Sequence, residues 1–161
     1  MGRRKLYFPN FRIYAIIKRM NTYHWYSQLK KPKWSPPSWL FAPVWIALYV
    51  LIFISFGKVF LLVYQKQIPF IIILPFILNI IFNLAFTPLE FKLKNNLLAA
   101  LDVLLVLGTL IWAMVAIFFA SQELVSAGGS SLIWIVYFQI PYLLWVTFAT
   151  TLQLSITYLN R

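Results

Sequence analysis

Four long uncharged segments dominate the pattern of hydrophobic and polar positions along this chain. They cover residues 34–57, 67–89, 103–122 and 124–160, and most of their side chains are apolar. Each reaches the roughly 20 residues that an α-helix needs to cross the hydrocarbon core of a bilayer. The short alternating strands of a membrane β-barrel are not visible in the pattern. We therefore expect an all-α integral membrane protein with four transmembrane helices.

Prolines limit the first two of these helices. The first is expected over residues 40–63. Pro69 should open the second, because proline is favoured in the first turn of a helix. That helix should run to about residue 86 and stop before Pro88, since the residue before a proline disfavours the helical conformation.

Polar and small residues separate the last two helices. A polar turn at residues 92–96 leads into a third helix, expected over 97–120. The glycine- and serine-rich residues 126–131 have the composition of a loop. The last helix is expected over 132–158, where Pro141 should kink it or mark a break.

Charge follows the same alternation. The chain is 62% hydrophobic and only 11% charged, too few polar residues to cover a soluble domain of this length. Nine of its fourteen basic residues precede Trp34, and alternating spans place twelve on the N-terminal side of the membrane and two on the other. This is the positive-inside pattern of a multi-pass protein.

The net charge of +11 therefore indicates a lipid bilayer as partner, not nucleic acid. Without cysteine, disulfides and thiolate sites are excluded.

Two regions of different composition divide the chain. Residues 1–33 form a basic leader whose apolar patch, residues 13–17, is too short to cross a bilayer. No apolar core follows the first charges, so the leader does not have the pattern of a cleavable signal peptide. Residues 34–161 should form the transmembrane bundle.

Three tryptophans and three prolines gather at residues 34–45, where the first long apolar segment begins. Indole rings favour the boundary between water and hydrocarbon, and prolines hold an extended approach before a helix starts. This segment should be a rigid aromatic entrance to the first transmembrane helix.

Four motifs along the chain give a family resemblance. They are Trp25-Tyr26 with Pro36-Pro37, Trp39 and Pro43-Val44-Trp45; Asn83-Leu84-Ala85-Phe86-Thr87-Pro88; Leu101-Asp102 with Leu104-Leu105-Val106; and Pro141-Tyr142, Trp145 and Phe148-Ala149-Thr150-Thr151-Leu152. In order and spacing they resemble the TspO/MBR family, which includes the tryptophan-rich sensory proteins, the translocator proteins and the peripheral-type benzodiazepine receptors. The resemblance implies a TspO-like helical bundle: four clear transmembrane helices preceded by a degenerate first helix, because the basic leader stands where the family has a helix.

The chain departs from the family pattern at several places. Phe86 replaces a tryptophan, Thr87 replaces a proline, and Gln153 replaces an asparagine. Leu98 stands where mammalian members have a tryptophan. A missing first helix would also remove part of the wall of the family's ligand cavity.

The resemblance implies a membrane-embedded protein that binds hydrophobic planar ligands: a porphyrin or haem, a sterol, or a benzodiazepine-type drug. No cofactor is obligatory, and the role would be sensing or transport of the tetrapyrrole or sterol. The residues implied around the ligand are Trp39, Phe41, Ala42, Val44, Trp45, Asn83, Phe86, Leu98, Asp102, Leu105, Trp145, Phe148, Ala149 and Leu152. The alternative is a light- or oxygen-dependent porphyrin-degrading enzyme, in which Trp39, Trp45 or Trp145 would relay electrons.

Three polar residues within the apolar segments have two readings each. Asp102 is either a ligand or proton site, or a structural carboxylate near a helix end. Asn79 and Asn83 share one helix face, and their amides either join helices or contact a ligand.

The remaining features are weaker. His24 is the chain's single histidine, and no set of residues suggests a metal site. Ala116 and Ala120 form a pair of small residues one turn apart, a spacing that permits the close helix contact of a homodimer. Leu154, Tyr158 and Arg161 fit a loose cholesterol pattern, but an interfacial anchor is the favoured reading. We expect a multi-pass protein of a bacterial envelope or an organelle membrane.

Overall fold

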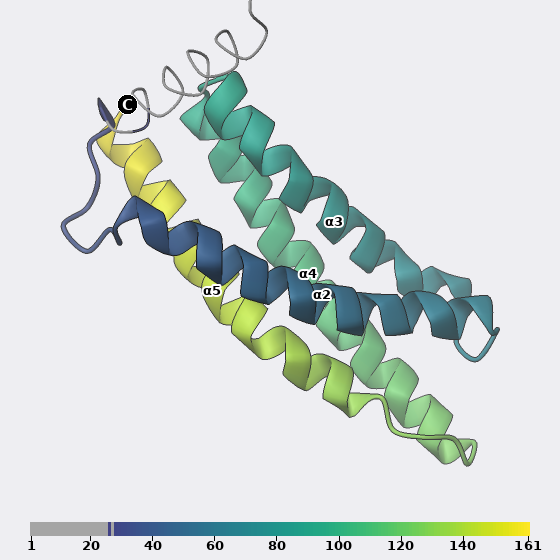
Figure 1. Ribbon diagram of the computed structural model, residues 1–161. Helices are drawn as coiled ribbons and strands as arrows, with labels where there is room; N and C mark the ends of the chain where they lie inside the picture. The colour runs from purple at the N-terminus through teal and green to yellow at the C-terminus, as the bar shows by residue number, and fades with distance from the viewer. Residues whose placement is uncertain (1–25, 27) are drawn as a thin grey trace, which may run out of the picture.

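The computed structural model describes residue 26 and residues 28–161, and in that part of the chain all regular structure is helical. Four long helices are present (Figure 1): α2 (Phe41–Tyr64), α3 (Leu74–Thr87), α4 (Asn96–Ser126) and α5 (Ile133–Leu159). Three short helical turns adjoin them: η1 (Ser38–Leu40), η2 (Phe70–Ile73) and η3 (Pro88–Lys92). The predicted all-α fold is confirmed. The expectations for a degenerate first helix, for the patch at 13–17 and for His24 lie outside the described residues.

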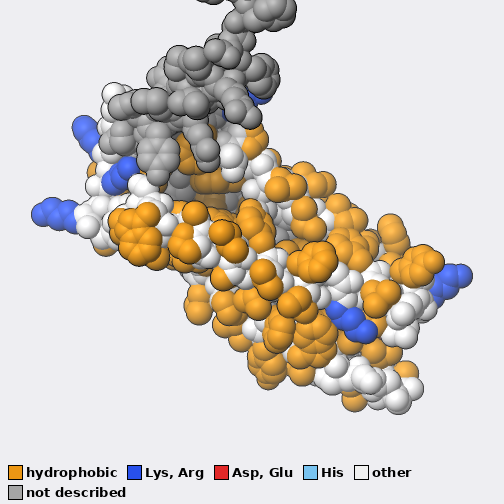
Figure 2. All heavy atoms as spheres, viewed as in Figure 1, with side chains coloured by type: hydrophobic (Ala, Val, Ile, Leu, Met, Phe, Trp, Pro, Cys, Tyr) orange, Lys and Arg blue, Asp and Glu red, His pale blue; other side chains and the backbone are white. Residues whose placement is uncertain are grey.

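All four helices are long and apolar enough to cross a membrane. The spans are Ser38–Tyr64, Phe70–Lys92, Asn96–Ser126 and Ile133–Leu159. Large apolar side chains remain exposed along every one of them, and Figure 2 shows them covering most of one face. Such a surface is suited to lipid tails, not to water. The chain is an integral, multi-pass membrane protein.

The two ends of the described chain meet at one end of the bundle. The backbone N–H of Lys30 donates to Oδ1 of Asn160, and Nδ2 of Asn160 donates to the Lys30 carbonyl, both at 2.9 Å. The chain crosses the membrane four times between Lys30 and Asn160, so both residues lie on the same side. Six basic residues belong to that end: Lys30, Lys31, Lys33, Lys92, Lys94 and Arg161. Lys58 and Lys66 lie toward the other, so the described residues keep the charge asymmetry seen in the sequence.

Helix α4 packs along both α3 and α5, and α2 crosses α5 (Figure 1). One core cluster lies near the loop between α2 and α3, where the Phe56 and Phe76 rings meet edge to face with centroids 4.7 Å apart. A second surrounds Tyr142 in the middle of the bundle. Helices α2 and α3 meet at residues 65–69 and separate toward the opposite end (Figure 1). This separation leaves room for a cavity.

The predicted end of the second helix is confirmed, because α3 ends at Thr87, directly before Pro88. A single turn of π-helix follows it, in which the N–H of Leu93 donates to the Pro88 carbonyl at 2.9 Å. Thr87, just before the proline, keeps helical angles of −59° and −49°. The preference against helix before proline is a bias, and the wider turn accommodates the ring. The extra turn carries Glu90 into the bundle.

The largest difference between an expected and an observed helix end is in α4. Helix α4 begins at an N-cap, Asn95, whose side-chain oxygen accepts from the N–H groups of Leu97 and Leu98, and it extends to Ser126, beyond the expected end. Helix α5 runs through Pro141 without the break that we considered. Packing on both α2 and α4 keeps the helix continuous where local preference disfavours it.

Candidate functional site

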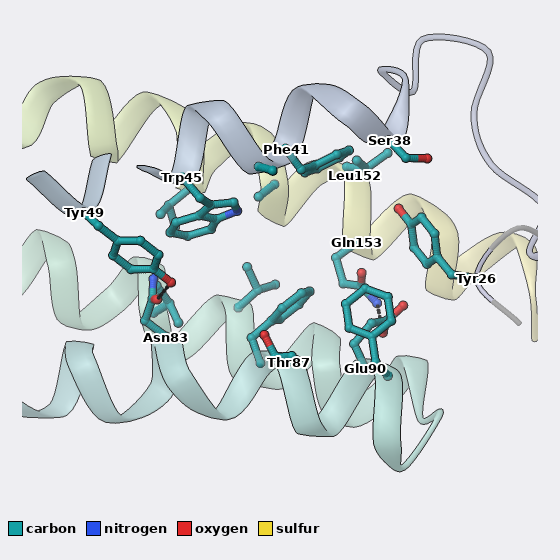
Figure 3. Close-up of a pocket in the computed structure, with 17 residues that line it drawn as sticks. Tyr26, Ser38, Phe41, Trp45, Tyr49, Asn83, Thr87, Glu90, Leu152 and Gln153 are labelled. Atoms are coloured by element: carbon teal, nitrogen blue, oxygen red, sulfur yellow. Dashed lines mark hydrogen bonds between the residues drawn. The ribbon is translucent and has the colours of Figure 1, made fainter. Parts of the chain in front are cut away.

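A cavity of about 540 Å³ lies among the four long helices, with α2 and α5 on one side and α3 and α4 on the other (Figure 3). This volume falls within the range of small-molecule sites. The lining residues come from every long helix and from the segment before α2. They are Tyr26, Ser38, Phe41, Ala42, Trp45, Tyr49, Asn83, Phe86, Thr87, Glu90, Phe91, Val103, Val106, Val146, Ala149, Leu152 and Gln153.

Helical spacing explains how each helix contributes a stripe to the lining. In α2, Phe41, Trp45 and Tyr49 follow one another at intervals of four and so share one face. In α5, Val146 and Ala149 are three residues apart, which places them together on the face toward the cavity. The walls that result are mainly apolar and aromatic.

Aromatic contacts brace the α2 wall from behind. The Phe41 ring meets the Trp145 ring edge to face, with centroids 5.7 Å apart. Trp145 in turn contacts Phe148 at 5.6 Å, and Phe148 contacts Trp34 at 5.7 Å. Such pairs add stability beyond the area that they bury, so they hold the Phe41 ring in place at the cavity surface. The series links α2, α5 and the entrance segment.

One end of the cavity is closed by a chain of hydrogen bonds. The Tyr49 hydroxyl donates to Oδ1 of Asn83 at 3.0 Å, and Nδ2 of Asn83 donates to the Tyr142 hydroxyl at 2.8 Å. Tyr142 donates onward to Oδ1 of Asn79 at 3.1 Å, and Nδ2 of Asn79 donates to the Val106 carbonyl at 2.9 Å. The network joins all four long helices. Every amide atom in it has a partner.

The opposite end contains a carboxylate. Glu90, carried by η3, is 0% exposed and lines the cavity. Nε2 of Gln153 in α5 donates to its Oε2 at 3.0 Å (Figure 3). Its other oxygen, Oε1, is buried and has no hydrogen-bond partner within the described part of the chain. Buried polar atoms without partners are rare in folded proteins and require an explanation.

Tyr26 lies beside this carboxylate end (Figure 3). Its ring packs on Phe91 with centroids 5.6 Å apart, and Nζ of Lys31 sits 3.9 Å from the ring centroid. Burial, followed by the negative charge of Glu90, raises the pKa of Tyr26 above its ordinary value. Tyr26 therefore keeps its hydroxyl proton at physiological pH and can donate a hydrogen bond there.

Comparison with known proteins identifies the fold. The model of the TspO/MBR family matches residues 8–159. The chain belongs to the TspO/MBR family. Tryptophan-rich protein TspO of Bacillus cereus is 36% identical over 136 residues, which cover 84% of this chain and 80% of that protein.

More distant members of the TspO/MBR family match to a similar extent. Tryptophan-rich protein TspO of Chlorobaculum tepidum is 29% identical, covering 84% of this chain and 79% of that protein. The human translocator protein is 32% identical, covering 80% of this chain and 70% of that protein. The family resemblance inferred from the motifs is confirmed.

The TspO/MBR cavity brings together part of the predicted set. The predicted residues in its lining are Phe41, Ala42, Trp45, Asn83, Phe86, Ala149 and Leu152. Trp145 and Phe148 stand behind Phe41, one layer from the lining. Val44 packs against the second core cluster.

Three of the other predicted residues point outward. Trp39 is 70% exposed, which suits an aromatic anchor at the membrane boundary. Leu98 and Leu105 on α4 are also exposed, on a surface available to lipid. These three side chains lie outside the cavity lining.

The structure shows which of the three intramembrane polar residues join helices and which line the cavity. Asn79 is buried and joins α3 to α4 and α5, whereas Asn83 both joins helices and lines the cavity. Asp102 is buried on α4, next to the lining residue Val103, but is not itself in the lining. Its Oδ2 has no hydrogen-bond partner in the described structure.

Several lining residues were not anticipated from the sequence: Tyr26, Ser38, Tyr49, Thr87, Glu90, Phe91, Val103, Val106, Val146 and Gln153. Spacing could have identified four of them: Tyr49, Thr87, Glu90 and Gln153 each follow a predicted lining residue by four positions. Glu90 comes directly after the uncharged segment 67–89, so the sequence pattern does not distinguish it from a charge at the membrane boundary. Among the described residues, no group of three or more His, Cys, Asp or Glu side chains could hold a metal ion.

Proposed function

We propose that this TspO/MBR protein binds hydrophobic planar ligands, taken up from the bilayer, in the cavity between α2 and α3. The candidate ligands are a tetrapyrrole such as protoporphyrin IX or haem, a sterol, or a benzodiazepine-type drug, and the role is sensing or transport. The observation that carries the proposal is an apolar, aromatic cavity of about 540 Å³ inside the membrane-spanning bundle. Flat rings of Phe41 and Trp45 suit stacking on a planar molecule.

The names of two relatives are in keeping with this role. A protein of Cereibacter sphaeroides that is 31% identical is a tryptophan-rich sensory protein, and the human relative is a translocator protein. Sensing and translocation both require that a ligand be bound.

A titration of the purified protein tests the proposal. Protoporphyrin IX, haem and cholesterol are added separately while tryptophan fluorescence is recorded. Trp45→Ala should weaken binding about tenfold, because it removes one stacking surface from the cavity. Trp112→Ala is the matched control, since Trp112 is exposed on α4 outside the lining and its loss should leave affinity unchanged.

Failure of all three ligands to saturate, or equal effects of the two variants, would contradict the proposal. A new absorbing product formed under light and oxygen would instead support the degrading enzyme.

A homodimer is part of the same proposal, but the alanine pair gives it little support. Ala120 is buried in the chain's own core cluster and is not available to a second copy. Chemical crosslinking in native membranes tests for the dimer, and a single monomer band would contradict it.

A further inference from the structure

At the carboxylate end of the cavity, one oxygen of Glu90 has no hydrogen-bond donor among the described residues. Glu90 is fully buried, one oxygen accepts from Gln153, and Oε1 has no partner among the described residues. Taking a carboxylate out of water is unfavourable unless hydrogen bonds or a positive charge compensate it. Glu90 lies in the wall of the cavity and its side chain is covered, so a ligand contacts Oε1 once the adjoining side chains shift.

The rest of the described lining does not supply a positive charge. It contains hydroxyl and amide groups but no Lys, Arg or His, and Lys31 contacts the Tyr26 ring without lining the cavity. Glu90 is also the only carboxylate among the described lining residues. Its field should therefore attract a cation and repel an anion.

We propose that Glu90 makes the cavity selective for planar apolar ligands that carry a hydrogen-bond donor, above all a protonated amine. This inference rests on the proposed function and specifies the chemistry of its ligand. The amine lies at the end formed by Glu90, Gln153 and Tyr26, and the flat apolar body extends toward Trp45 (Figure 3).

Each residue at that end has a defined role. Oε1 of Glu90 accepts the N–H of the ligand in a charge-assisted hydrogen bond, which is stronger than a neutral one. Gln153 is a positioning residue, because its bond to Oε2 orients the carboxylate. A ligand with a carboxylate of its own must place that group away from Glu90, which makes acidic ligands weaker binders than amines of the same ring size.

Three fluorescent probes with the same number of fused rings test this selectivity: 9-aminoacridine, a cation; anthracene, which is neutral; and anthracene-9-carboxylate, an anion. All are titrated into the purified full-length protein in mildly basic buffer. The affinity should fall in that order. Between the cation and the anion we expect at least about a tenfold difference, the worth of one charge-assisted hydrogen bond.

Glu90→Gln supplies the decisive variant because it keeps the side-chain shape and removes the charge. It should abolish most of the preference for the cation, so that the ratio of the 9-aminoacridine affinity to the anthracene affinity falls toward one. Glu123→Gln is the matched control: it removes one carboxylate from an exposed position near the end of α4, outside the lining, and should keep the wild-type order.

The possible outcomes separate the inference from the proposed function. If anthracene binds but the cation is not preferred, or if Glu90→Gln and Glu123→Gln behave alike, the inference is wrong and the proposed function stands. If none of the probes binds, the inference is wrong, and the titration with protoporphyrin IX, haem and cholesterol decides the proposed function separately. The order of the three probes on the unmodified protein decides the matter even if Glu90→Gln does not fold.

Discussion

The two polar ends of the cavity differ in how completely their polar groups are hydrogen-bonded. At the Asn83 end, Tyr49, Tyr142 and Asn79 satisfy one another, and the network joins four helices. At the Glu90 end, a single bond from Gln153 leaves one carboxylate oxygen without a partner in the described chain. Polar groups that pair across helices hold a bundle together, whereas an unpaired buried group reduces stability. The first end therefore stabilises the fold, and the second is where we propose that a ligand binds.

The largest effect is expected from Tyr142→Phe, which breaks the Asn83 end at its centre. The hydroxyl accepts from Asn83 and donates to Asn79, so its removal leaves two amide groups without that partner. We expect a loss of about 2 kcal/mol in the free energy of unfolding. Unfolding in mixed micelles measures it. The control is Tyr137→Phe on the same helix, where the side chain is exposed; equal losses in the two variants would show that the network is not stabilising.

A smaller effect of opposite sign is expected at the other end. Replacing Glu90 and Gln153 together by leucine removes an incompletely paired buried carboxylate and its partner. Such exchanges are neutral or stabilising, so the free energy of unfolding should stay the same or rise by about 1 kcal/mol.

The same kind of exchange at the Asn83 end, Asn83→Leu with Tyr49→Phe, should destabilise the protein, because it leaves the Tyr142 hydroxyl without its donor. Thermal unfolding of the two double variants in detergent compares them directly. If both double variants changed the stability in the same direction, the polar groups at the two ends would contribute to stability in the same way.

The smallest effect is expected from Tyr49→Phe alone. Its hydroxyl is at the outer end of the network and its side chain is exposed, so the bond to Asn83 should contribute only about 0.5 kcal/mol. Tyr64→Phe, at the exposed end of α2, serves as control. If Tyr49→Phe lowered the free energy of unfolding as much as Tyr142→Phe does, Asn83 and not Tyr142 would be the central residue of the network.

The fold could be predicted from the sequence more completely than the site. Long uncharged segments specify membrane helices because lipid provides no partner for a peptide group or a charge. The turn of π-helix after α3 could not be predicted in the same way, since it continues the helical path through Pro88. The sequence pattern would place Glu90 in a loop, whereas this turn carries it into the bundle.

The family motifs predicted part of the cavity lining. Trp45, Asn83 and Ala149 belong to the motifs and line the cavity. Trp145 belongs to a motif but lies one layer behind, because the rotation of α5 places Val146 and Ala149 toward the cavity instead. A motif identifies the helix, and packing decides which of its faces is used.

By itself, the sequence determined the membrane environment, the number of described spans, the charge asymmetry and the family. Each of these depends on composition and order along the chain, and the transfer of apolar segments into lipid is a local property. Only the tertiary structure decided which polar groups are paired and which are open to the cavity. Pairing depends on the rotation and crossing of helices that are far apart in sequence, as with Asn83 and Tyr142, or Glu90 and Gln153. The difference between an amide that is paired across helices and a carboxylate oxygen without a partner in the described chain exists only in three dimensions.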